Sequence, residues 1–239
     1  MKATNHPTSA IRRRYTGIMG GSFNPVHTGH LLMAQDAAEY FELDRVFFIP
    51  CATPPHKVGT DLASAEHRLN MLKAAVTRVP LFEINTLEIE RGGRSYSVDT
   101  VDRLRKTYRH DKFFFILGDD SLVDLPEWYR IDDLLEICEF VTLARPGVEI
   151  PAGAPAIEDA RQREQLLSRR RVGHSLNVSS TEIRDRVASG RSIRYLVPDA
   201  VADYIDGHRL YRDSGKTKTS PASCGDHTTA ANCQKLHTI

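Results

Sequence analysis

From position 15 onwards, short apolar runs alternate with amphipathic stretches along the chain. The run from Phe113 to Leu117 is apolar at every position, which is typical of a strand buried on both faces of a parallel sheet. Such strands, separated by amphipathic helices, predict a doubly wound α/β fold. We expect strands at residues 16–19, 46–50, 82–85, 113–117 and 140–144, and helices at residues 30–41, 65–79, 97–108, 131–137, 180–189 and 198–206.

Residues that favour helix ends support several of these helices. Ser64 directly precedes one apolar periodic run, and Pro198 suits the first turn of the last helix. Ser97 is placed to cap a helix that begins with Val98.

A length of 239 residues suits one sizeable globular domain with short extensions. We expect a flexible arm at residues 1–14 and a single folded domain at residues 15–213. Apolar periodicity then ends, so residues 214–239 are expected to form a disordered tail. Residues 147–171 are rich in proline and alanine and then strongly charged, which indicates a surface insertion with some helix.

Composition excludes several classes of protein. Lysine and arginine number 32 against 31 aspartates and glutamates, and a net charge of +1 gives no support for a nucleic-acid partner. No apolar run is long enough to cross a bilayer and no signal-peptide core is present, so we expect a soluble, cytoplasmic protein without a membrane partner. The four cysteines lack CxxC spacing, so a cysteine metal site is not expected.

The first predicted strand is followed by residues 20–30, which read GGSFNPVHTGH. Glycines let a backbone approach a phosphate closely, and the next helix offers unpaired N–H groups and the positive end of its dipole. His27 and His30 can donate hydrogen bonds to phosphate oxygens from one side. The structural alternative is a tight glycine turn with two surface histidines.

Two further clusters lie near other strand ends and helix starts. Prolines stiffen the loop after the second strand and hold His56 and Lys57 outward, where a lysine offers phosphate a mobile charge. Taken alone, this loop is better explained as a plain proline turn with solvated charges. In the segment from Tyr96 to Thr100, capping explains Ser97 and leaves Tyr96 and Thr100 free to contact a ligand.

Gly118 and Asp119 directly follow the buried fourth strand. A carboxylate there suits ribose hydroxyls or a Mg²⁺ ion bound to phosphates, although helix capping is the alternative. Trp128 is either a core residue or a ring that stacks on a planar heterocycle. In residues 178–184, three hydroxyls gather at a predicted helix start and Arg184 follows, which together favour a phosphate site over a simple cap.

The histidine turn resembles the HxGH signature of the nucleotidyltransferase superfamily. Taken in order, these motifs resemble bacterial nicotinate-nucleotide adenylyltransferases over residues 16–211. The resemblance implies a Rossmann-like, mainly parallel sheet with helices on both faces and a small C-terminal helical part. It also implies an enzyme of NAD biosynthesis that transfers AMP from ATP to nicotinate mononucleotide, with Mg²⁺ accompanying ATP and no covalent intermediate.

The same resemblance implies roles for individual residues. Catalysis would depend on His27, His30, Lys57 and Arg184. ATP and its phosphates would be bound by Gly20, Gly21, Ser22, Phe23, Gly118, Asp119, Ser179, Ser180 and Thr181. The mononucleotide would be bound by Asn24, His56, Tyr96, Thr100, Trp128 and Tyr129. The family commonly has an aspartate where this chain has Asn24, and the residues alone do not explain the missing charge.

Three alternatives stay open at this point. A related adenylyl- or cytidylyltransferase acting on phosphopantetheine or glycerol phosphate shares the glycine-rich turn, and a regulator could bind nucleotide without chemistry. Preference for nicotinamide over nicotinate mononucleotide is also undecided, because a carboxylate and an amide differ by contacts that backbone groups or waters can make. The oligomeric state is not indicated by any apolar stripe or heptad.

Overall fold

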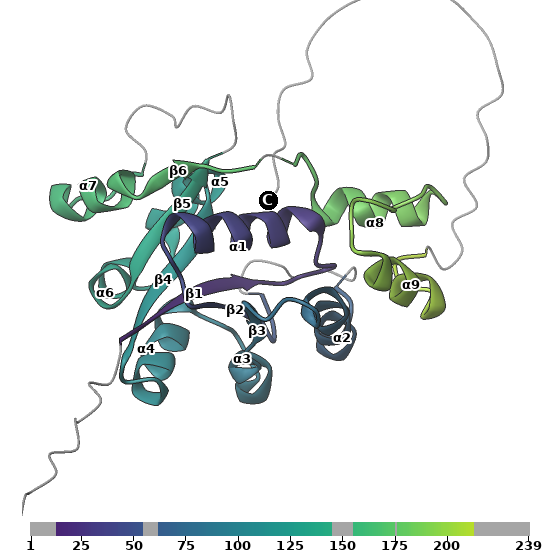
Figure 1. Cartoon of the computed structure of the whole chain (residues 1–239), viewed down its shortest axis with the longest axis horizontal. Helices are drawn as coiled ribbons and strands as arrows, with labels where there is room; N and C mark the ends of the chain where they lie inside the picture. The colour runs from purple at the N-terminus through teal and green to yellow at the C-terminus, as the bar shows by residue number, and fades with distance from the viewer. Residues whose placement is uncertain (1–12, 55–61, 145–154, 175, 213–239) are drawn as a thin grey trace, which may run out of the picture.

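The computed structural model describes residues 13–54, 62–144, 155–174 and 176–212. Within these ranges six strands form one parallel sheet (Figure 1). The strands are β1 (Arg14–Gly21), β2 (Arg45–Pro50), β3 (Phe82–Ile84), β4 (Asp111–Gly118), β5 (Glu139–Ala144) and β6 (Arg170–Val172). The helices are α1 (Thr28–Tyr40), α2 (Ala65–Val76), α3 (Leu87–Arg91), α4 (Ser97–Thr107), α5 (Asp120–Asp124), η1 (Leu125–Glu127), α6 (Ile131–Ile137), α7 (Ala160–Ser168), α8 (Ser180–Ala188) and α9 (Asp199–Gly207).

The strand order reverses beside β1. The chain runs outward from β1 to β2 and β3, and then returns to the other side of β1 for β4, β5 and β6. Open α/β sheets bind ligands at the carboxyl ends of their strands, at such a reversal. Residues 20–27 leave β1 at this point and lead into α1 (Figure 1).

Alternate residues of β4 face opposite sides of the sheet, as the pleat requires. Phe114 and Ile116 belong to the core cluster that contains residues of α1, α2, α8 and α9. Phe113, Phe115 and Leu117 belong to the cluster that contains residues of α3, α4, α6 and α7. Helices therefore cover both faces, and the predicted doubly wound α/β fold is confirmed.

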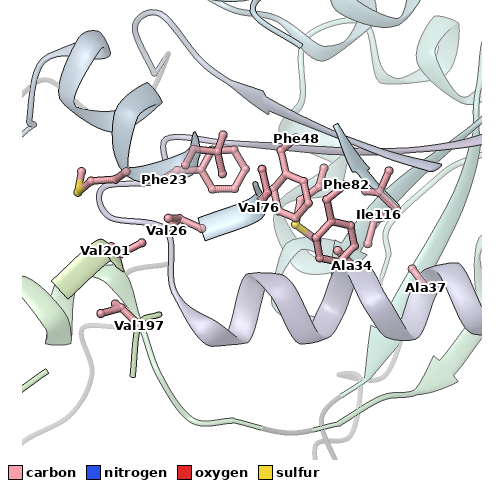
Figure 2. Packing of buried hydrophobic residues seen from close by; sticks show 14 of the residues in the cluster. Phe23, Val26, Ala34, Ala37, Phe48, Val76, Phe82, Ile116, Val197 and Val201 are labelled. Carbon is pink, nitrogen blue, oxygen red and sulfur yellow. The ribbon is translucent and has the colours of Figure 1, made fainter. Parts of the chain in front are cut away.

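Small residues let α1 pack closely against the sheet. Ala34 and Ala37 are fully buried, and Figure 2 shows them close to the sheet residues Phe82 and Ile116. At the other end of the same cluster, Val26 packs with valines that precede and begin α9 (Figure 2). The turn before α1 is thus held between the sheet and the C-terminal helices.

Most predicted elements are present, with small shifts at their ends. Ser64 caps α2, and its side chain accepts a hydrogen bond of 3.2 Å from the backbone N–H of His67. The prediction that Ser97 caps the next long helix was wrong, because α4 begins at Ser97 and Tyr96 is the capping position. Pro198 is the residue just before α9 rather than part of its first turn. Three short helices, α3, α5 and η1, were not predicted.

The predicted insertion at residues 147–171 contains helix as expected, in α7, but its last two residues belong to a strand of the sheet that was not predicted. Residues 170–172 form β6, which pairs with β5 from Thr142 to Ala144. Charged side chains are common on edge strands because they discourage pairing with another chain. Because this segment is charged, its pattern did not indicate the edge strand that completes the sheet.

No helix in the described part of the chain is long and apolar enough to cross a membrane. The predicted tail lies outside the described residues, as does all of the predicted arm except its last two residues. The proposed domain boundaries therefore stay predictions.

Candidate active site

The turn between β1 and α1 is buried rather than displayed on the surface. Phe23 adopts a φ of 47° and its ring packs against Phe48 and His30, with ring centroids 5.8 and 5.2 Å away. Few non-glycine residues adopt this backbone conformation. Here it directs the Phe23 ring into the core instead of into solvent. The turn that was predicted to hold phosphate is thus a rigid part of the core.

His27 and His30 lie together at the start of α1. Their rings are stacked, with centroids 3.7 Å apart and an angle of 30° between the planes. The backbone N–H of His27 donates to Nδ1 of His30 over 3.2 Å. Since that nitrogen accepts, the neutral ring carries its proton on Nε2, which becomes a donor.

The pKa of His30 is held well below its ordinary value. Burial is the main cause, because it disfavours the charged ring, and the neighbouring His27 adds repulsion. At neutral pH His30 is therefore an uncharged donor with a defined tautomer. An uncharged donor of this kind can hydrogen-bond an anion but cannot neutralise its charge.

The N-terminus of α8 is joined directly to this turn. Ser179 caps the helix and accepts from the backbone N–H of Glu182 over 3.1 Å. Ser180 Oγ donates to the carbonyl oxygen of Pro25 over 2.9 Å. The histidine turn and the start of α8 are more than 150 residues apart in the chain, yet they lie side by side. The predicted phosphate site requires this proximity.

Arg184 makes the second connection between the two motifs. Its Nη1 donates to the carbonyl oxygen of Asn24 over 2.9 Å, and its Nη2 donates to Thr181 Oγ1 over 3.3 Å. A guanidinium has five N–H donors, and these contacts use two of them. The Arg184 guanidinium therefore docks the start of α8 on the turn.

Gly29 makes this close approach possible. A Cβ atom at this position would lie 3.1 Å from Val178 Cγ1 and 3.1 Å from His27 Nδ1. Both neighbours are themselves buried, so neither can give way easily. The glycine between the two histidines therefore lets the chain before α8 approach the start of α1 closely.

Asn24 has a structural role that the sequence did not indicate. Its Oδ1 accepts from the backbone N–H of Ala63 over 3.1 Å and from the hydroxyl of Tyr211 over 2.8 Å. Burial raises the pKa of Tyr211, so this hydroxyl stays a donor at neutral pH. An amide oxygen satisfies both donors, which explains how this position functions without a carboxylate.

On the other side of β1, Asp119 follows β4 and is buried. Arg170 of β6 binds its carboxylate through Nε and Nη2, at 3.2 and 2.8 Å, and this hydrogen bond raises the pKa of Arg170. Gly118 lies against α1, where a Cβ atom would be 3.4 Å from the Met33 methyl group. Asp119 is therefore a buried, ion-paired residue at the carboxyl end of β4.

Of the residues predicted for the mononucleotide, Tyr96 and Thr100 lie at the start of α4, and Trp128 and Tyr129 follow η1. The rings of Tyr96 and Tyr129 are 4.5 Å apart, and Trp128 packs edge-on against Phe115 with centroids 5.6 Å apart. Thr100 is buried and its hydroxyl donates to Glu88 over 2.5 Å. That hydroxyl is engaged within the protein, whereas Tyr129 is exposed.

Burial raises the pKa of Glu88, and hydrogen bonds from Thr100 and Ser95 oppose this effect.

The loop that carries the predicted residues His56 and Lys57 lies outside the described residues.

Sequence reasoning missed Arg68, which is fully buried on α2. Its guanidinium donates to backbone carbonyl oxygens of Ser22, Cys51 and Ala52 over 2.9, 2.7 and 2.9 Å, and Nε donates to Ala63 over 3.1 Å. It thus ties the glycine turn to the chain after β2. An arginine inside the buried face of an amphipathic helix was the available signal.

Comparison with known proteins places this arrangement in a family. A match to the cytidylyltransferase-like family covers residues 18–186. A "Probable nicotinate-nucleotide adenylyltransferase" of Citrifermentans bemidjiense is 42% identical over 212 residues, covering 83% of this chain and 98% of that protein. A protein of the same name from Lactiplantibacillus plantarum is 39% identical over 214 residues, covering 89% of this chain and 95% of its own.

Solved structures with low sequence identity share the fold. The nicotinic acid mononucleotide adenylyltransferase of Plasmodium falciparum, complexed with APC, is 18% identical and has a TM-score of 0.65. The same protein complexed with NaAD is 19% identical with a TM-score of 0.65. Each match covers 83% of this chain and 97% of that chain.

Proposed function

This chain belongs to the cytidylyltransferase-like family and, within it, to the nicotinate-nucleotide adenylyltransferases, and we propose that it transfers AMP from ATP to nicotinate mononucleotide, releasing pyrophosphate and deamido-NAD. The names of its relatives support the choice of substrates, and the structures with NaAD and APC are consistent with it.

The observation that carries the proposal is the contact between the histidine turn and α8. Ser180 and Arg184 donate to the carbonyl oxygens of Pro25 and Asn24, which brings the stacked histidines and the α8 cap to one place. A helix N-terminus, an arginine and two imidazoles form a donor set for a chain of phosphates.

In this mechanism a phosphate oxygen of the mononucleotide attacks the α-phosphorus of ATP in line. The new bond forms between these two atoms, while the bond to the bridging oxygen breaks and its electron pair leaves with pyrophosphate. The nucleophile is already an anion, so no protein base is needed. His27, His30 and Arg184 supply donors that position the phosphates and stabilise their developing charge.

Mg²⁺ suits this site as a partner of ATP rather than as an ion held by the protein. The described residues contain no group of three His, Cys, Asp or Glu side chains that could hold a metal, and the Asp119 carboxylate is paired with Arg170. Mg²⁺ prefers phosphate oxygens and water. When bound, it would neutralise charge on the leaving pyrophosphate.

A substrate panel tests the proposal. Nicotinate mononucleotide, nicotinamide mononucleotide, phosphopantetheine and glycerol phosphate are each supplied with ATP or with CTP, and pyrophosphate release is measured. We expect the highest kcat/KM with nicotinate mononucleotide and ATP. Higher kcat/KM with CTP, or with an acceptor that lacks a pyridine ring, contradicts the proposal.

The His30→Ala variant separates catalysis from nucleotide binding. Losing one donor at the reacting phosphates should lower kcat by about 100-fold. The matched control is His110→Ala, which removes an exposed histidine outside the site. Nucleotide binding by the wild-type protein without pyrophosphate release would support a regulator instead.

A further inference from the structure

The cap of α8 is reached by a segment that runs back along α1. We call residues 170–174 and 176–180 the strap. Val172 lies at the C-terminal end of α1, where its carbonyl oxygen accepts from the hydroxyl of Tyr40 over 2.8 Å. Val178 lies at the N-terminal end, against Gly29. The strap therefore runs antiparallel to α1, from β6 to α8 (Figure 1).

Between these two ends, Asp36 of α1 holds the strap at His174. One carboxylate oxygen accepts from the backbone N–H of His174 over 2.6 Å, and the other accepts from its Nδ1 over 2.6 Å. Asp36 is buried, and a Cβ atom on Gly173 would lie only 2.6 Å from its Oδ2. The backbone of the strap thus passes directly over the carboxylate.

The imidazole of His174 contributes little by burial. Its side chain is 75% exposed, so its main contact is the hydrogen bond to Asp36. That hydrogen bond, followed by the charges of Asp36 and Glu39, raises the pKa of His174, which strengthens the pair as the ring protonates. The His174 ring stays in solvent while its hydrogen bond to the buried Asp36 carboxylate holds the backbone of the strap in place.

The chain after this tether has little regular structure before α8. Leu176 to Ser179 form no helix or strand; Leu176 and Val178 pack on the core, and the next side-chain hydrogen bond is the one from Ser180 to Pro25. The placement of the Ser179 cap therefore depends on the tether at His174 together with this packing and the Ser180 contact. Freeing one end would increase its conformational entropy in the unbound protein, which ligand binding must then reduce.

We propose that the Asp36–His174 pair is a positioning element for the triphosphate, because it fixes the strap that carries the α8 cap. This inference rests on the proposed function, in which ATP phosphates bind at that cap. His174 acts here through Ser179, Thr181 and Arg184 and has no contact with the reacting atoms.

The test compares two variants of His174 with the wild-type protein. His174→Ala removes the Nδ1 donor, whereas His174→Asn keeps an N–H donor near the same position. We expect His174→Ala to raise the KM for ATP about tenfold, with the KM for nicotinate mononucleotide changed by less than about twofold. The His174→Asn variant should restore most of the affinity for ATP.

Tyr40→Phe is the matched control, because it removes a different side-chain hydrogen bond between α1 and the strap, on the far side of the tether from α8. Its KM for ATP should stay within about twofold of the wild-type value. Equal rises in both KM values for His174→Ala, or an unchanged KM for ATP, overturn the proposal.

Amide hydrogen exchange, measured on the protein without substrates, tests the tether independently of enzyme activity. Amides of residues 176–184 should exchange faster in His174→Ala than in the wild-type protein or His174→Asn. Unchanged exchange overturns the tether even if the enzyme is active. Absence of AMP transfer by the wild-type protein, together with faster exchange in His174→Ala, contradicts the proposed function and leaves the tether intact.

Discussion

At His30, a hydrogen bond from the backbone decides how the side chain can meet a ligand. The N–H of His27 occupies Nδ1, which leaves Nε2 as the donor. Burial and the stacked His27 ring keep His30 uncharged at neutral pH. Local chain geometry therefore sets both the tautomer and the charge of a residue at the centre of the proposed site.

This charge state predicts a pH dependence of stability. The pKa of His30 is lowered in the folded state, so the unfolded state binds more protons below a pH of about 6.5 and the free energy of unfolding falls there. His30→Gln removes this contribution. Between pH 7 and pH 5, we expect the variant to lose about 1–2 kcal/mol less stability than the wild-type protein.

Urea unfolding at several pH values measures this difference. The raised pKa of His174 acts in the opposite direction, since its pair with Asp36 stabilises the protein below the unfolded pKa and is lost as pH rises through the folded pKa. That contribution is the same in both proteins and cancels in the comparison. Parallel stability curves would show that His30 titrates normally.

At the scale of elements, the start of α8 combines a helix cap with contacts to the histidine turn. Ser179 satisfies the backbone N–H of Glu182, while Ser180 and Arg184 bind the histidine turn. The three roles belong to neighbouring residues because a helix start exposes unpaired N–H groups and two or three side chains at once. The Ser179 hydroxyl therefore caps the helix, whereas the Ser180 hydroxyl and the Arg184 guanidinium dock it on the histidine turn.

Substitutions at Ser179 separate these roles. Ser179→Ala should lower the free energy of unfolding by about 1 kcal/mol, because a cap is lost. Ser179→Asp should keep the cap and the stability, yet raise the KM for ATP because it adds negative charge beside the phosphates. Ser189→Ala, at the exposed C-terminal end of the same helix, is the control for both measurements. Tighter ATP binding by Ser179→Asp contradicts the phosphate site.

At the scale of the whole molecule, buried polar groups join distant segments around the turn. Asn24 accepts from Tyr211 near the end of the described chain and from Ala63 before α2. Arg68 joins the turn to the chain after β2. Such groups are costly unless every partner is present, so they specify one arrangement of the segments.

Tyr211→Phe tests this arrangement. Removing the hydroxyl leaves Asn24 Oδ1 with the donor from Ala63, and we expect the free energy of unfolding to fall by about 1 kcal/mol. Tyr195→Phe is the matched control, because Tyr195 is 89% exposed and should change stability by less than about 0.5 kcal/mol. Equal effects of the two variants contradict a role for the Asn24 contact.

Local sequence patterns predicted the elements that are stabilised by interactions between residues close together in the chain or by simple burial. The all-apolar run from Phe113 to Leu117 predicted the central strand β4, since both of its faces are covered. Ser64 predicted the start of α2 because its cap needs a partner only three residues away. In contrast, β6 was missed, because its charged residues are stabilised by pairing with β5 and not by burial.

The sequence by itself determined five of the six strands, most of the helices and the residues that form the proposed phosphate site, because hydrophobic periodicity and helix caps act over a few residues. Only the tertiary structure decided what those residues contact. It engaged the Thr100 hydroxyl with Glu88, gave Asn24 two donors and placed His174 on Asp36. These contacts join residues from 12 to 187 positions apart, and no local pattern encodes which buried donor will meet which acceptor.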